Sequence, residues 1–137
     1  MKASVMLFNF IDKSRAQTIG RALLPLGIRI MKINKEDYNQ PLGYLAGVKE
    51  IESVEGKYDG EELQGEMMVL VGITGKMVDD VLLALRKSGI GRINHKAVLT
   101  LTNQYWNTIQ LYEELVREHE EVTKQLKKNK KGIGNKE

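Results

Sequence analysis

Amide, hydroxyl and glycine residues follow three apolar runs of the sequence, and such residues commonly hydrogen-bond small ligands. Asn9 follows the first run, the stretch GITGK at residues 72–76 follows the second, and Thr102 and Asn103 follow the third, with Trp106 just beyond. If these runs are strands of a parallel sheet, their carboxyl ends share one edge, where ligands bind. We therefore predict a ligand-binding rim composed of Asn9, Thr74, Gly75, Lys76, Asn103 and Trp106.

The chemistry of this predicted rim suits recognition of a neutral or anionic molecule. GITGK lies between a predicted strand and a predicted helix, where the helix N-terminus attracts anions. It lacks the spacing of a P-loop, and Met77 replaces the serine or threonine that follows the P-loop lysine. The rim contains no good general base, which favours binding over catalysis but leaves an enzyme as an alternative. It also stays open that Asn9 and Asn103 only cap turns.

The composition excludes several kinds of chemistry. The sequence has no cysteine, which removes disulfides, thiolate nucleophiles and cysteine metal centres. His95 and His119 are far apart in the sequence, and neither has a partner at ligand spacing. We expect His95 to be exposed and His119 to be packed against the core or a partner. A metal site with Asp79 or Asp80 is the alternative, but we predict no metal and no cofactor.

Length and charge indicate a single soluble domain. The chain has 137 residues, of which 42% are hydrophobic and 28% charged, as in ordinary globular domains. The net charge of +3 is too small to indicate nucleic acid by itself. The first apolar run is interrupted by Asp12 and Lys13 and is too short for a signal peptide, and no run is long enough to cross a bilayer. These features predict a cytoplasmic protein without a membrane partner.

Two segments repeat the order strand, helix, strand. They are residues 5–33 and residues 68–93, and the strand that completes the second copy follows at residues 96–102. In each, a short apolar run precedes a helical pattern that stops at Gly27 or Gly89, where glycine readily adopts a left-handed conformation. Two such βαβ units predict an α/β fold: a small four-stranded, mainly parallel sheet flanked by helices. A ferredoxin-like α+β sandwich is the alternative, because two βαβ copies also build that fold.

The segment between the two units has two parts. A short helix is expected to begin near Pro41. The second part, residues 50–66, is rich in glutamate and contains three glycines. We expect it to form an exposed loop or a weak edge hairpin.

Residues 102–126 have the apolar spacing of one long helix. Asn103 is the expected N-cap, which places Trp106 in the first turn on the charged side. Either this turn touches protein on all sides, or Trp106 belongs to a pocket or partner surface. A helix reaching Lys128 would be about 39 Å long at 1.5 Å per residue. Because a small sheet is shorter, residues 116–126 are expected to project and to form a homodimer, or else to fray.

The C-terminal tail is basic and lacks apolar spacing. We predict a domain of residues 1–126 and a disordered tail of residues 127–137. The tail's lysines allow electrostatic contact with nucleic acid or anionic lipid. The aromatic residues of a base-stacking surface are missing, which argues against a nucleic-acid partner.

One part of the sequence resembles the signature of a bacterial domain family of unknown function. The pattern is K-A-V-x-T, then N-x-x-W, then L-x-x-E-L-x-x-E, and here it consists of Lys96, Ala97, Val98, Thr100, Asn103, Trp106, Leu111, Glu114, Leu115 and Glu118. The stretch YNQPLGYLAG at residues 38–47 is similar to the family's middle element, and the similarity covers most of the chain up to about Glu121. The resemblance implies a shared architecture and no assigned activity.

Three functions follow from these observations. The first is a non-catalytic binding or regulatory domain that self-associates or binds an unknown protein or small molecule. The second is a small-ligand protein or enzyme that uses the rim for an anion or nucleotide-like molecule. The third is electrostatic nucleic-acid binding through the lysine tail.

Overall fold

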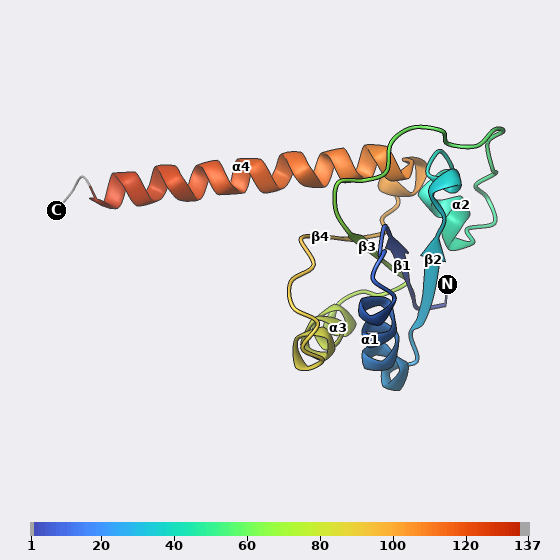
Figure 1. The fold of residues 1–137 in the computed structure, drawn as a ribbon, viewed down its shortest axis with the longest axis horizontal. Helices are drawn as coiled ribbons and strands as arrows, with labels where there is room; N and C mark the ends of the chain where they lie inside the picture. Colours follow the sequence, from blue (N-terminus) through green and yellow to red (C-terminus); the bar gives the residue numbers. More distant parts are fainter. Residues whose placement is uncertain (1, 135–137) are drawn as a thin grey trace.

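In the computed structural model, residues 2–134 are described, with side chains described as far as Lys127, and they are built around a four-stranded sheet (Figure 1). The strand order across the sheet is β2-β1-β3-β4. The strands are β1 (Ser4–Phe8), β2 (Arg29–Ile33), β3 (Met67–Val71) and β4 (His95–Val98). The α-helices are α1 (Lys13–Leu23), α2 (Leu42–Ala46), α3 (Lys76–Lys87) and α4 (Thr108–Gly134). Short 3-10 helices are η1 (Leu24–Leu26), η2 (Lys35–Asp37) and η3 (Asn103–Tyr105).

The two predicted βαβ units are present. β1 pairs in parallel with β2, and β3 pairs in parallel with β4. In a split βαβ arrangement another strand lies between the two strands of a unit, whereas here they are direct neighbours. The α/β fold with a mainly parallel sheet is therefore confirmed, and the ferredoxin-like alternative does not describe it.

The junction between the two units is antiparallel. β1 and β3 run in opposite directions, with Ser4 opposite Val71 and Phe8 opposite Met67. The expectation that both units point the same way is wrong. Both strands are buried along their whole length, so their apolar pattern is the same in either direction. The long connection at residues 34–66 can bring β3 back in either orientation.

The sheet is covered by helices on both faces. Successive residues of a strand point to opposite faces, so β1 and β3 contribute to two separate cores. The first core joins Val5, Leu7, Met68 and Leu70 to α1 and α3. The second core joins the alternate residues of the same strands to α2 and the beginning of α4, through Tyr38, Leu42 and Leu111. Figure 1 shows α1 and α3 together on one side of the sheet.

The connection between the two units agrees with its prediction. Pro41 precedes the short helix α2, and residues 52–66 form no helix or strand. Gln40 holds this loop, because its side-chain amide donates to the carbonyl of Val54 (2.8 Å) and accepts from the Val54 amide (2.8 Å). The acidic segment is therefore an irregular loop and not a hairpin.

The long C-terminal helix begins later than expected. Asn107 and Gln110 exchange backbone-to-side-chain hydrogen bonds of 2.9 Å each, which is the reciprocal pattern of a capping box. Asn103 instead begins the preceding turn, and Trp106 has an extended backbone. The prediction of Asn103 as the N-cap is therefore wrong, because an asparagine four residues later supplies a better-placed cap.

The far part of α4 extends away from the rest of the molecule (Figure 1). Leu111 near its beginning is 2% exposed, whereas Val122 and Leu126 are 58% and 64% exposed. The helix continues past the expected end to Gly134, and residues 135–137 lie outside the described part. The division into a domain of residues 1–126 and a tail of residues 127–137 stays a prediction.

Candidate functional site

The residues of the predicted rim do not meet at one edge of the sheet. Asn9 follows the carboxyl end of β1, which lies beside the beginning of β3. Gly75 and Asn103 follow the carboxyl ends of β3 and β4, which lie at the opposite edge. The rim depended on both units pointing the same way, and the antiparallel junction separates its members.

Asn9 ties the end of β1 to the loop before β3. Its side-chain amide donates to the carbonyls of Leu63 (2.8 Å) and Gly65 (3.2 Å). Its backbone is left-handed, with φ of 61°, a conformation that asparagine tolerates better than most residues. Its side-chain oxygen is buried without a hydrogen-bond partner among the described residues. These contacts give Asn9 a structural role in joining β1 to the acidic loop.

Asn103 stabilises the turn between β4 and α4. Its side-chain oxygen accepts from the Thr100 amide (2.8 Å), and its side-chain nitrogen donates to the Val98 carbonyl (3.0 Å). Its own backbone amide donates to the Thr100 hydroxyl (3.0 Å). Asn103 is buried, so these local bonds occupy the groups that the predicted ligand would need.

Thr74, Gly75 and Lys76 form an exposed turn at the beginning of α3. Gly75 is the N-cap, with φ of 58°, and no side chain caps this end of the helix. α3 packs in the first core, whereas Asn103 leads to α4 in the second core. The helices that follow these two parts of the rim therefore pack on opposite faces of the sheet.

Trp106 lies immediately before α4 and is half-buried against the second core. Its carbonyl accepts from the Leu42 amide (2.8 Å), which fixes α2 against the entry to α4. Trp106 is the residue before the N-cap, and Leu111 is the fourth residue of the helix. These are the two positions whose apolar side chains pack together in a hydrophobic staple. Trp106 also borders a cavity of about 350 Å³, whose lining includes Gln110 and Arg117. Both explanations for this tryptophan therefore have a structural basis, and ligand binding there stays a prediction.

A small cavity lies where the parallel strands β1 and β2 end. Its volume is about 270 Å³, and its lining includes Asn9, Lys32, Lys35, Tyr38 and Glu62. Burial raises the pKa of the Tyr38 hydroxyl above its ordinary value, and the Glu62 carboxylate raises it further. Tyr38 therefore stays protonated at neutral pH and cannot serve there as a base.

The two histidines lie close together, which the sequence analysis missed. The His95 ring is 4.9 Å from the Tyr112 ring and 6.2 Å from the His119 ring, between centroids. His95 is half-buried and His119 is exposed, the reverse of the expectation. Tyr112 and His119 are seven residues apart on one face of α4, which was the available signal. Within the described ranges, no three histidine or carboxylate side chains gather in the manner of a metal site.

Burial lowers the pKa of His95 below its ordinary value, and the charges of His119 and Lys96 lower it further. A positive charge on His119 therefore disfavours one on His95. His119 belongs to α4 and His95 to β4, so this contact joins the helix to the sheet.

The fold and these sites define a three-layer α/β domain with a projecting C-terminal helix. Residues 66–122 match the model of a domain family of unknown function (DUF3783). The match covers β3, α3, β4 and the first part of α4. It confirms the resemblance to an uncharacterised family, while residues 38–47 lie outside the match and the motif stays a prediction. No curated protein and no solved structure matches the chain.

None of the helices within residues 2–134 combines the length and the apolar content that crossing a membrane demands. The longest, α4, carries charged residues throughout.

Proposed function

We propose that this chain is a non-catalytic interaction domain that self-associates through the distal segment of α4, defined as residues 116–126. The observation that carries the proposal is the exposure of large aliphatic side chains on a helix that leaves the body of the molecule (Figure 1). An exposed aliphatic row on an unsupported helix is typical of a surface that another helix covers.

The apolar side chains of α4 follow a seven-residue repeat. Tyr112, Leu115, His119, Val122 and Leu126 are spaced three and four residues apart in alternation, as at the a and d positions of a coiled coil. Tyr112 and Leu115 pack in the second core. The same row then continues into the distal segment, where it leaves the body of the domain.

A second copy of the chain is the occupant that fits this row. Fully burying a valine or leucine side chain contributes about 1.5–3 kcal/mol. A symmetric pair buries Val122 and Leu126 twice, because each copy contributes the same row. The covering helix must be long, straight and apolar on one face, which the distal segment itself is.

The charges along α4 favour an antiparallel pair. Residues 113–121 contain five glutamates and one arginine, whereas residues 124–131 contain five lysines and no acidic residue. Antiparallel pairing places the basic part of one helix beside the acidic part of the other. Parallel pairing would place like charges side by side, which is unfavourable.

Sedimentation velocity of two matched double variants tests the proposal. The variant Val122→Gln/Leu126→Gln removes the exposed apolar row, and the control Lys49→Gln/Glu52→Gln changes exposed residues outside α4 at unchanged net charge. We expect the wild type and the control to sediment as dimers and the first variant as a monomer of 15.5 kDa. A wild type that is monomeric at every concentration tested would contradict self-association.

The other functions have less support. A ligand site on the predicted rim would need Asn9 and Asn103 to act together, and they follow strand ends at opposite edges. Nucleic-acid binding through the tail involves side chains beyond Lys127, outside the described ones. Deletion of residues 128–137 would test it, because loss of retention on a nucleic-acid column at low salt would support it. The cytoplasmic location and the bacterial origin stay proposals based on the sequence.

A further inference from the structure

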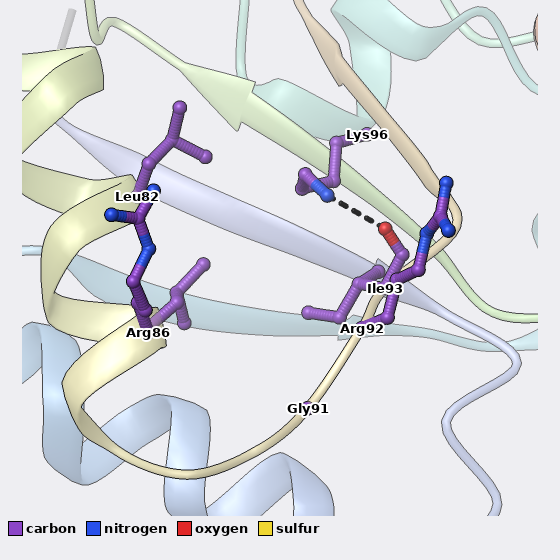
Figure 2. A pocket seen from close by; sticks show the side chains of 7 residues that line it. Leu82, Arg86, Gly91, Arg92, Ile93 and Lys96 are labelled. Carbon is purple, nitrogen blue, oxygen red and sulfur yellow. Dashed lines mark hydrogen bonds between the residues drawn. The ribbon is translucent and has the colours of Figure 1, made fainter.

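A cavity of about 400 Å³ lies between α3 and the segment that leads into β4 (Figure 2). Three of its lining residues are cationic, and three are aliphatic. They are Arg86, Arg92 and Lys96, and Leu82, Leu85 and Ile93. We call it the basic cavity. Figure 2 shows Arg86 on the α3 side and Arg92 on the opposite side, with Lys96 between them.

The three cations of the basic cavity are not neutralised within the protein. None of them forms an ion pair with a carboxylate among the side chains described up to Lys127. The neighbouring Arg15 behaves differently, because its guanidinium pairs with Glu66 at 2.7 Å. Cations that line a hollow without counter-charges create a positive potential that attracts anions.

Lys96 has hydrogen-bonding capacity left for a ligand. Its ammonium group donates to the Ile93 carbonyl (2.7 Å), as the dashed line in Figure 2 shows. An ammonium group carries three N–H donors, so two remain. Burial lowers the pKa of Lys96 below its ordinary value, and the charge of Arg92 lowers it further. A bound anion would relieve this repulsion.

Arg15 holds in place the segment that carries Arg92 and Ile93. Arg15 of α1 donates to the carbonyls of Ile90 (2.7 Å) and Arg92 (3.4 Å) while it pairs with Glu66. The wall of the cavity is therefore positioned before any ligand arrives, which lowers the entropy cost of binding.

We propose that the basic cavity binds a small phosphorylated organic molecule. The phosphate lies among Arg86, Arg92 and Lys96, because guanidinium groups donate paired hydrogen bonds to phosphate oxygens. The non-polar part of the molecule lies on the aliphatic lining, and the volume is that of sites for small ligands. This site is separate from the distal segment of α4, so it goes beyond the proposed self-association.

Isothermal titration calorimetry of the full chain with ADP, pyrophosphate and adenosine tests the proposal. We expect ADP to bind more tightly than pyrophosphate, because it can also cover the aliphatic lining, and adenosine to bind much more weakly. In Arg86→Gln/Arg92→Gln, ADP affinity should fall by about tenfold for each arginine, the size of one charged hydrogen bond. Lys96→Gln should also weaken ADP binding.

The matched control is Arg21→Gln/Lys87→Gln, which removes two exposed cations outside the lining and changes the net charge equally. It should keep ADP affinity within about twofold of the wild type, since neither side chain lines the cavity and exposed charges are screened by salt. An equal loss in the control would overturn the site in favour of non-specific attraction, and no binding of either phosphate would overturn it altogether. Equal affinity for pyrophosphate and ADP would overturn the role of the aliphatic lining. The Val122→Gln/Leu126→Gln variant should bind ADP normally, which separates this test from that of self-association.

Discussion

The two parts of α4 have the same apolar periodicity and opposite surroundings. In the near segment, residues 108–115, Leu111 is 2% exposed and packs against the sheet, whereas Leu126 in the distal segment is 64% exposed. The periodicity defines which face of a helix is apolar, and it does not define what covers that face. In the near segment the cover is the second core of the domain. In the distal segment we propose that the cover is another copy of the chain.

The largest contrast is expected from truncating one leucine in each segment. Leu111→Ala removes a buried side chain and should lower the free energy of unfolding by about 2–5 kcal/mol. Leu126→Ala should change it by less than about 0.5 kcal/mol in dilute solution, where the chain is monomeric. Urea unfolding followed by circular dichroism measures both. At higher protein concentration the effect of Leu126→Ala should grow, because association stabilises the folded state.

The outcome that would remove this contrast is an equal loss of stability in the two variants at low concentration. It would mean that Leu126 is buried within a single chain, so that the distal segment is not a free surface.

A smaller effect is expected from the cap that starts the near segment. Asn107→Ala removes the bond to the Gln110 amide and should lower the free energy of unfolding by about 1 kcal/mol. Asn107→Ser is the matched control, because serine caps helices about as well as asparagine. Thermal unfolding of the two variants compares them. Equal losses would mean that the helix does not depend on this cap, and that Asn107 contributes in another way.

The smallest effect is expected for His95, whose ring lies beside Tyr112 of the near segment and His119 of the distal segment. The pKa of His95 is lowered in the folded state, so the unfolded chain binds more protons below the ordinary value of 6.5. Stability should therefore fall as the pH drops through 6.5 towards the folded-state pKa. His95→Gln should flatten this dependence between pH 7 and pH 5.5, while His119→Gln should reduce it less. Unfolding free energies of both variants across this range provide the measurement, and a slope that His95→Gln leaves unchanged would contradict the assignment.

Local patterns predicted most elements of the fold correctly. The apolar runs of β1 and β3 and the glycine stops act over a few residues, and each is found where the sequence places it. Strand direction could not be predicted from such local patterns. Because β1 and β3 are buried on both faces, their apolar pattern is the same in either direction. The predicted rim depended on that direction, so it was lost with it.

The cavities and the histidine pair depend on contacts between distant parts of the chain. His95 meets His119 only because α4 crosses the beginning of β4, and no local pattern encodes that crossing. The basic cavity likewise combines Arg86 of α3 with Lys96 of β4, and Arg15 of α1 holds its wall. Lys96 belongs to the motif that the sequence analysis singled out, but its motif partners Asn103 and Trp106 lie elsewhere.

Distances between identical positions of two chains test the central proposal most directly. The sequence contains no cysteine, so one cysteine introduced at residue 120, 124 or 127 carries a nitroxide label at a single site per chain. In an antiparallel pair, the label-to-label distance measured by double electron–electron resonance should change with position. The offset along the axis grows by about 3 Å per residue from the crossing point, twice the helical rise. Absence of dipolar coupling at all three positions would contradict pairing through the distal segment, and equal distances at all three would contradict the antiparallel arrangement.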